Sequence, residues 1–273
     1  MPARKPQPSL AELLAKANLD PQEGRDLLAF VAKKTTSYFV AHPESTLTPG
    51  QQAQFLTLAA KRRRGEPFAY LIGRQGFYGL DFIVMPDVLI PRPETEQLVD
   101  WALAHVNRKT PTTIVDVGTG SGCITVTLAK YLPQAKLIAS DVSEKALAVA
   151  RKNARAHKVS SRIAFRRGSL LSVLTPEEKA DLVVANLPYL TADQLKNLPR
   201  EPRLALDGGR HGLELVNTLI EQIVGRQIPQ AILEIAPQQE RWLIALADRT
   251  PNYHFTFLPD LTKRTRFFVV QKN

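Results

Sequence analysis

The sequence predicts an α/β fold, in which a doubly wound parallel sheet follows a small helical bundle. Two observations carry this prediction. Residues 10–71 show helical periodicity, whereas from residue 113 onwards apolar strand-like runs alternate with helical stretches. Strands that alternate with helices are typical of parallel sheets with right-handed crossovers. The chain of 273 residues is long enough for one large domain and one small one.

Two helix starts are clear in the N-terminal segment. Asp20 and Thr48 are each followed by proline, as expected for an N-cap residue with proline in the first helical position. The basic run Lys61–Arg64 precedes Gly65. A helix often ends this way, because positive charge suits the negative end of the helix dipole and glycine suits the turn beyond it. We therefore expect a helical domain over residues 1–74.

A β-hairpin is expected next, over residues 75–92, with Pro86-Asp87 near its turn. The signal consists of glycines and alternating apolar residues, namely Gly76, Gly79, Leu80, Phe82 and Val84. This hairpin would link the helical domain to a sheet domain over residues 93–273.

Five strand-like runs indicate parallel strands: 113–117, 136–140, 162–166, 181–185 and 231–235. Helical stretches follow most of them, for example 121–131, 143–157 and 212–223. Residues 253–258 and 266–271 come last and are joined by a short polar loop, so we expect an antiparallel pair at the sheet edge. The result is a seven-stranded, Rossmann-like sheet, and the antiparallel pair is typical of methyltransferases rather than of ordinary Rossmann domains.

Composition excludes several classes of protein. The apolar fraction of 44% and the charged fraction of 23% are ordinary for a globular protein, and a single cysteine, Cys123, rules out an internal disulfide framework. Residues 1–10 lack the apolar core of a signal peptide and no long apolar stretch follows, so we expect a cytoplasmic protein without a membrane partner. The net charge of +10 suits a nucleic acid, or a partner that travels with one, as well as it suits mere solubility.

A glycine-rich turn follows the first expected strand of the sheet domain. Gly118, Gly120 and Gly122 alternate with Thr119 and Ser121, and the spacing differs from that of the dinucleotide fingerprint. A lysine of the P-loop type is missing, so a triphosphate is not the expected ligand. Asp141 ends the next strand, where a carboxylate can bind both hydroxyls of a ribose.

Residues Asn186-Leu187-Pro188-Tyr189 follow the fourth strand. The side-chain oxygen of Asn186 and the carbonyl of Leu187 can accept hydrogen bonds from a planar NH2 group, and Tyr189 can lie against its face. Open α/β sheets bind ligands at the carboxyl ends of their strands. The glycine-rich turn, Asp141 and Asn186 all fall at such ends, which indicates one site for group transfer to an amide or amine nitrogen.

At these residues the chain resembles the S-adenosylmethionine-dependent methyltransferases that modify the glutamine of the Gly-Gly-Gln loop in peptide chain release factors (the PrmC/HemK family). The resemblance covers nearly all of residues 65–273, and Leu89–Glu96 is its most discriminating segment. The other matching segments are Pro67–Gly73, Phe77–Gly79, Val115–Cys123, Asp181–Tyr189, Glu201-Pro202, Ala205–Gly209, Asp260-Leu261 and Arg266.

The resemblance implies a function and a set of site residues. The cofactor would be S-adenosylmethionine, and the substrate a glutamine of class 1 peptide chain release factors, recognised with the help of the helical domain. The substrate would be held by Asn186, Leu187, Pro188 and Tyr189. Cofactor contacts would come from Gly118, Thr119, Gly120, Ser121, Gly122, Asp141, Leu170 and Asn186. We expect the enzyme to act as a monomer.

Four positions depart from the family pattern. Leu187 replaces the usual first proline, and the resulting Asn-Leu-Pro-Tyr form is typical of ribosomal-RNA adenine dimethyltransferases. Ser169 stands where aspartate is common, which removes one expected contact to the adenine amine. His211 and Ala236 replace aspartate and glycine.

Alternatives therefore stay open: methylation of adenine in ribosomal RNA or DNA, methylation of a ribosomal-protein glutamine, and a binding module without catalysis. Arg92, Glu94 and Glu96 suit either the first turn of a helix or the wall of the pocket. The five histidines are scattered, so we expect no metal.

Overall fold

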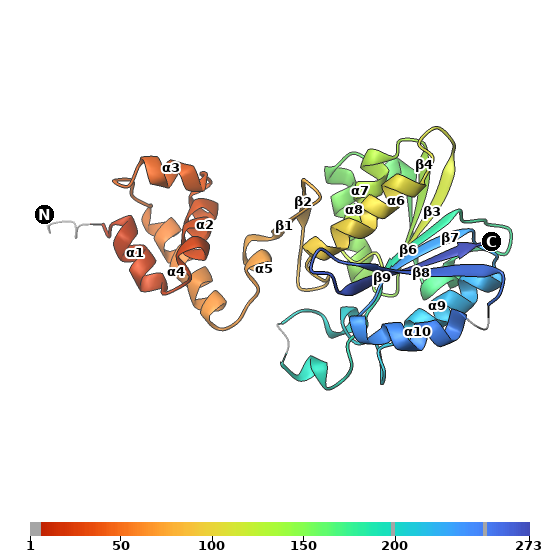
Figure 1. Ribbon diagram of the computed structural model, residues 1–273. Helices are drawn as coiled ribbons and strands as arrows, with labels where there is room; N and C mark the ends of the chain where they lie inside the picture. Colours follow the sequence, from red (N-terminus) through yellow and green to blue (C-terminus); the bar gives the residue numbers. More distant parts are fainter. Residues whose placement is uncertain (1–6, 198–199, 248–249) are drawn as a thin grey trace, which may run out of the picture. The chain divides into compact units, whose positions relative to one another are not determined.

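The computed structural model describes residues 7–197, 200–247 and 250–273. The chain divides into two compact units, one ending at Gly73 and the other beginning at Arg74 (Figure 1). Residues 1–6 of the expected helical domain, and residues 198–199 and 248–249 of the expected sheet domain, lie outside the described residues.

The first unit is helical around one apolar core. Its helices are α1 (Leu10–Ala17), α2 (Pro21–Ala32), α3 (Thr36–Ala41), α4 (Pro49–Arg63) and α5 (Phe68–Ile72). Asp20 and Thr48 are the N-caps of α2 and α4, as predicted. Arg62 binds Glu23 through two hydrogen bonds of 2.8 Å, which ties α4 to α2. Phe55, Leu27 and Leu13 are almost fully buried in the core.

The second unit begins with a two-stranded hairpin, β1 (Arg74–Phe77) and β2 (Leu80–Ile83). The predicted turn at Pro86-Asp87 is wrong, because Phe77 pairs with Leu80 and the turn is Tyr78-Gly79. Both turn residues have positive φ, 52° and 70°. Two-residue hairpin turns that match the strand twist require this conformation, which glycine adopts easily and tyrosine rarely.

The hairpin packs against α8 (Glu144–Ala156) of the same unit. The Asn153 side chain accepts a hydrogen bond from the Ile83 N–H at 2.7 Å and donates to the Ile83 carbonyl at 3.0 Å. The hairpin edge is therefore covered by an amide side chain that mimics a neighbouring strand.

The main sheet has seven strands in the order β5-β4-β3-β6-β7-β9-β8. The strands β3 to β7 are parallel, and β9 runs antiparallel to both β7 and β8, as predicted for a methyltransferase-type sheet. Their bounds are β3 (Thr112–Val117), β4 (Ala135–Asp141), β5 (Ile163–Arg167), β6 (Leu182–Asn186), β7 (Gln230–Glu234), β8 (Tyr253–Pro259) and β9 (Thr265–Lys272).

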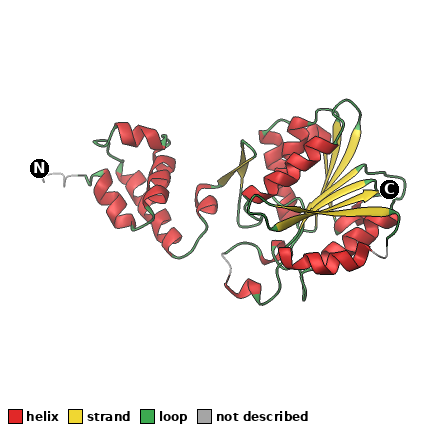
Figure 2. Ribbon diagram, viewed as in Figure 1, coloured by secondary structure: helices red, strands yellow, loops and turns green. Residues whose placement is uncertain are grey.

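Helices cover both faces of this sheet (Figures 1 and 2). On one face α6 (Glu96–His105), α7 (Cys123–Tyr131) and α8 share a core with Ile114 and Leu182. On the other face α9 (Glu214–Gly225) and α10 (Glu240–Ala247) share a core with Val115 and Val183. Successive strand residues point to opposite faces, so burial on both sides explains why the central strands are apolar throughout.

Short 3-10 helices connect several elements. Those near the strand ends are η1 (Pro93–Thr95), η3 (Leu170–Val173), η5 (Arg203–Ala205) and η6 (Pro237–Gln239). Among the described residues, no helix is both long enough and apolar enough to cross a membrane.

Candidate active site

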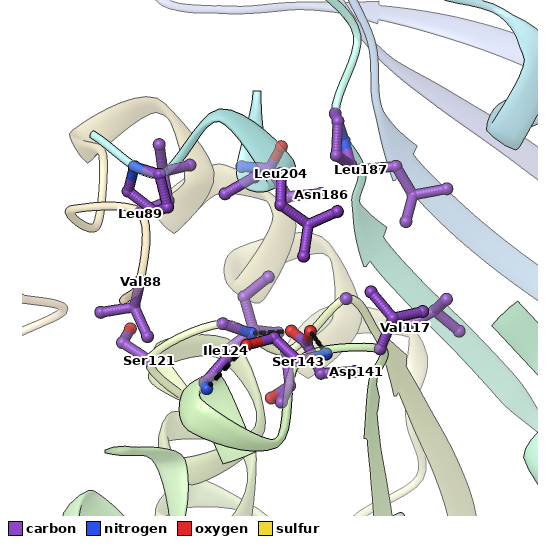
Figure 3. Close-up of a pocket in the computed structure, with 18 of the residues that line it drawn as sticks. Val88, Leu89, Val117, Ser121, Ile124, Asp141, Ser143, Asn186, Leu187 and Leu204 are labelled. Carbon is purple, nitrogen blue, oxygen red and sulfur yellow. Dashed lines mark hydrogen bonds between the residues drawn. The ribbon is translucent and has the colours of Figure 1, made fainter. Parts of the chain in front are cut away.

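One cavity of about 400 Å³ opens at the carboxyl ends of the central strands. Val117, Asp141 and Asn186, the last residues of β3, β4 and β6, all line it. Figure 3 shows Asn186 and Leu187 on one wall, facing Ile124, Ser143 and Asp141 across the cavity. The cavity is within the size range of small-molecule sites, roughly 300–1,000 Å³.

Most of the predicted site residues meet in this cavity. Those that line it are Gly118, Thr119, Gly120, Ser121, Asp141, Leu170, Asn186, Leu187 and Pro188. Gly122 and Tyr189 are not among the lining residues. Pro202, which precedes η5, and the exposed Leu204 within it also line the cavity; Pro202 was noted only as part of the family resemblance, and Leu204 was not noted.

The glycine-rich turn is compact because its backbone has a conformation that other residues avoid. Gly122 has φ +81°, and a Cβ added there would lie 3.0 Å from the Cβ of Ala150 on α8. Gly118 has φ +74°, and its missing Cβ leaves room for the buried Leu187 side chain, 3.2 Å from that position. Leu187, the departure from the family pattern, thus packs over the turn.

Asp141 fastens this turn to the end of β4. Its Oδ2 accepts a hydrogen bond from the Gly120 N–H at 3.0 Å, and its Oδ1 accepts one from the Ser143 N–H at 2.8 Å. Burial raises the pKa of the Asp141 carboxyl above its ordinary value, although these N–H groups act in the opposite direction. The carboxylate therefore lies at the cavity wall in a fixed orientation.

Beneath the turn lies a second carboxylate, Asp116, which is fully buried. The Thr119 hydroxyl donates a hydrogen bond of 2.7 Å to its Oδ2. Burial raises the pKa of Asp116 to about 7, despite the opposing effect of Thr119.

On the opposite wall, Asn186 is held by two residues that the sequence did not single out as site residues. Its Nδ2 donates to Oγ1 of Thr95 at 3.0 Å and to Oε2 of Glu234 at 2.9 Å. The Thr95 hydroxyl itself donates to Oε2 of Glu234 at 2.6 Å. Thr95 and Glu234 are each only 2% exposed, and burial raises the pKa of Glu234 to about 7. Two signals were available: Glu234 is a charged residue that ends an apolar run and so needs partners when buried, and Thr95 lies in the segment Leu89–Glu96 that carries the family resemblance.

Tyr189 is not among the residues that line the cavity, and its loop is fixed by a second segment. Leu190 accepts a hydrogen bond from the Gly208 N–H at 2.9 Å and donates one to the Leu206 carbonyl at 3.0 Å. A Cβ on Gly208 would lie 2.7 Å from the Pro188 carbonyl oxygen, and one on Gly212 only 2.3 Å from that of Tyr189. The two backbones therefore touch at positions where only glycine fits.

The segment before α6 is fixed in a similar way. Arg92 lines the cavity and forms an ion pair with Glu201, which also accepts a hydrogen bond from the Ile90 N–H at 3.0 Å. Glu96 does not line the cavity, and it accepts a hydrogen bond from the Tyr78 N–H at 2.7 Å. Arg92 thus contributes to the wall of the pocket, whereas Glu96 holds the hairpin turn.

Cys123 lines the cavity, but burial raises the pKa of its thiol to about 12, so it is not poised as a nucleophile. Within the described part of the chain, no group of three or more His, Cys, Asp or Glu side chains could hold a metal ion.

Two family models match this chain. One describes a methyltransferase domain and matches residues 114–209, and the other describes a PrmC N-terminal domain and matches residues 9–73. The release factor glutamine methyltransferase of Moorella thermoacetica is 38% identical over 257 residues, which cover 92% of this chain and 90% of the relative. That of Koribacter versatilis is 40% identical over 202 residues, 72% of this chain and 71% of the relative.

The chain belongs to the release factor glutamine methyltransferase family. The fold also agrees with solved methyltransferase structures. The catalytic domain of hMettl16 in complex with the MAT2A 3'UTR hairpin 6 has a TM-score of 0.58 at 16% sequence identity and covers 84% of each chain. At that identity the likeness concerns the fold alone. In this family member, then, the methyltransferase domain and the family's N-terminal domain are both present.

Proposed function

We propose that this protein transfers a methyl group from S-adenosylmethionine to the side-chain amide nitrogen of the glutamine in the Gly-Gly-Gln motif of class 1 peptide chain release factors. One observation carries the proposal. The glycine-rich turn with Asp141 lines the same cavity as Asn186 and the two residues that follow it. A nucleoside-type cofactor and a planar amide can therefore meet in one site, and family membership indicates the glutamine.

The chemistry of the lining fits this cofactor. The residues that would hold it are Gly118–Ser121, Gly122 by shaping the turn, Asp141 at the ribose, Leu170 against the adenine ring, and Asn186. When bound, S-adenosylmethionine supplies a methyl group on a positively charged sulfur, which a weak nucleophile can attack. The backbone turn and the fixed Asp141 carboxylate are preorganised to receive a polar, hydroxyl-bearing ligand.

On the substrate side, Asn186 and Leu187 would each accept one hydrogen bond from the glutamine NH2 group, through the side-chain oxygen and the backbone carbonyl respectively. Pro188 and Tyr189 would limit how the amide plane can tilt. The contribution of these residues to the rate is positioning of the nitrogen in line with the methyl group. The extra proton on the methylated nitrogen is acidic enough to leave to water.

The two units of the chain suggest two separate roles. Residues 1–74 would recognise the release factor, the hairpin at 75–92 would join them to the catalytic part, and residues 93–273 would carry the reaction. The match of residues 9–73 to the PrmC N-terminal domain supports this assignment. We propose a cytoplasmic monomer.

Two other substrates are compatible with the proposed binding of a planar NH2 group by Asn186–Tyr189. An adenine of RNA or DNA also presents a planar NH2 group, and the Asn-Leu-Pro-Tyr form with Leu187 is the observation that favours it. Such an enzyme would need room for an extruded base beside Tyr189. A glutamine of a ribosomal protein is the second alternative.

A parallel labelling experiment tests the proposal. The protein is incubated with labelled S-adenosylmethionine and either a class 1 release factor, ribosomal RNA, duplex DNA or ribosomal proteins. Label is expected on the release factor. Label on another substrate but not on the release factor would contradict the proposal.

The same assay tests the role of Asn186. We expect Asn186→Ala to lower kcat by about 100-fold or more, the scale for losing one preorganised polar group at a reacting centre. Asn217→Ala, on the exposed surface of α9, is the matched control and should keep full activity. Full activity of Asn186→Ala would refute the assigned mechanism.

A further inference from the structure

We propose that Glu234 and Thr95 are positioning residues that determine which end of the Asn186 carboxamide faces the substrate. The inference rests on the proposed function, because it assigns to the Asn186 oxygen the role of accepting a hydrogen bond from the substrate amide. It goes beyond that function in naming what selects the oxygen rather than the nitrogen.

Geometry brings the three side chains together from distant parts of the chain. Asn186 and Glu234 are register partners at the carboxyl ends of the adjacent strands β6 and β7. Thr95 ends η1, next to them, and its hydroxyl lies 2.6 Å from the Glu234 carboxylate. Thr95 and Glu234 are 2% exposed, so water competes little with these contacts.

The hydrogen-bond roles around Glu234 leave one consistent arrangement. An ionised carboxylate can only accept hydrogen bonds, so the single hydroxyl proton of Thr95 goes to Glu234. The Thr95 oxygen then meets Asn186 as an acceptor. Asn186 therefore faces two acceptors, at 3.0 Å and 2.9 Å, and both N–H groups of its Nδ2 are used.

The opposite orientation of the amide is disfavoured. If the Asn186 carboxamide turned over, its oxygen would face a carboxylate oxygen at about the present 2.9 Å, and two acceptors would be buried against each other. In the present orientation, Oδ1 is the polar atom of Asn186 that has no hydrogen-bond partner among residues 7–197, 200–247 and 250–273. Asn186 lines the cavity, so this oxygen is available to a substrate N–H group.

The charge on Glu234 is what enforces the arrangement, and it depends on pH. Burial, together with Glu94, raises the pKa of Glu234 to about 7, while Thr95, Arg266 and Tyr189 lower it. Below that pH the carboxyl gains a proton and becomes a donor, which would allow the Asn186 oxygen to turn towards it. The orientation is thus selected at and above neutral pH and is lost as the pH falls.

Glu234→Gln is the decisive variant, because glutamine keeps the shape but offers both a donor and an acceptor. We expect kcat for release factor methylation to fall by about 10- to 100-fold, by analogy with the cost of losing residues that orient metal ligands. The dissociation constant for S-adenosylmethionine, measured by calorimetry, should change little. Wild-type kcat should fall as the pH drops below about 7, and Glu234→Gln should lack this dependence.

A pair of variants at Thr95 keeps the test decisive even if Glu234→Gln does not fold. Thr95→Ser keeps the hydroxyl and should keep most of the activity. Thr95→Val has nearly the same shape without the hydroxyl and should lose kcat in the same way as Glu234→Gln. Equal activities of the two Thr95 variants would overturn the inference.

The outcomes also separate this inference from the proposed function. If wild-type protein does not methylate the release factor, the proposed function fails. If wild-type protein does, and Asn186→Ala abolishes the reaction, but Glu234→Gln retains kcat and the pH dependence of the wild type, then only the inference about Glu234 and Thr95 fails.

Discussion

Behind each of two walls of the cavity lies a buried carboxylate that accepts a hydrogen bond from a threonine hydroxyl. Behind the glycine-rich turn, which we propose holds the cofactor and call the cofactor wall, Thr119 donates to Asp116 across three residues of sequence. Behind Asn186 and the residues that follow it, which we propose hold the substrate and call the substrate wall, Thr95 donates to Glu234 across 139 residues. The first pair stabilises a local turn, whereas the second joins η1, β6 and β7. The cofactor wall can therefore be changed locally, but the substrate wall depends on the assembly of the whole sheet.

The largest loss of stability is expected from Gly212→Ala, which disturbs the backbone contact next to the substrate wall. The new Cβ would lie 2.3 Å from the Tyr189 carbonyl oxygen, and φ at this position is +72°. We expect a loss of about 2–4 kcal/mol in the free energy of unfolding, from overpacking and a left-handed alanine. In protein that remains folded, kcat for methylation should fall while the affinity for S-adenosylmethionine is kept. Denaturant unfolding, calorimetry and the labelling assay measure the three quantities.

Gly225→Ala is the control for this variant. Gly225 ends α9, and a Cβ there would meet nothing within 4 Å. An equal loss of stability in both variants would show that the close approach at Gly212 does not matter.

The second prediction compares how the two buried carboxylates, Asp116 and Glu234, change the stability of the protein with pH. Both have pKa values of about 7 because they are buried, well above the ordinary values of 3.8 for Asp116 and 4.5 for Glu234. Below the ordinary pKa, ionisation of either carboxyl does not lower the free energy of unfolding. The loss grows as the pH rises towards 7, and above pH 7 it stays constant. When the pH is raised from about 5 to about 8, the free energy of unfolding of Asp116→Asn and of Glu234→Gln should each increase by about 2–3 kcal/mol relative to that of wild type.

Urea unfolding at both pH values measures this gain. Glu178→Gln is a control with the opposite shift, because the hydrogen bond from Arg166 lowers the pKa of Glu178 to about 2, so its difference from wild type should stay constant between these two pH values. A pH-independent difference between Glu234→Gln and wild type would mean that Glu234 does not carry a raised pKa.

The smallest effect is expected on the cofactor wall, from Gly122→Ala. The positive φ of +81° and the 3.0 Å approach to Ala150 should cost about 1–2 kcal/mol. The expected pattern is the reverse of that for Gly212→Ala, because the affinity for S-adenosylmethionine should fall while the KM for the release factor stays close to that of wild type. Calorimetry measures the affinity for S-adenosylmethionine, and steady-state kinetics measure the KM for the release factor. A rise in the release factor KM alone would contradict the assignment of separate roles to the two walls.

The difference between contacts that are local in sequence and contacts between distant segments explains what could be predicted from the sequence. Gly118–Gly122 and Asp141 were found because their structure depends on neighbours in the chain and on one adjacent strand. The parallel strands of the sheet followed from the alternation of strands and helices. Thr95 was not found, because its role appears only when η1 meets the end of β7. Gly208 was noted only as part of a resemblance, since the backbone it touches lies in another loop.

The misplaced hairpin turn has a related cause. Pro86-Asp87 has the composition of a turn, whereas Tyr78 is an unusual residue for positive φ. Its conformation is supported by Glu96, which accepts the hydrogen bond of the Tyr78 N–H. A distant side chain thus outweighed the local preference.

The position of β9 has a consequence for biosynthesis. This strand, Thr265–Lys272, lies between β7 and β8 and pairs with Glu234 through Phe267. During translation β7 is made long before β9, so its edge stays open until the later residues have left the ribosome. An open apolar edge invites pairing with other chains. Until β9 has paired, this edge of the nascent protein is thus open to other chains, and slow translation of residues 235–264 would prolong that interval.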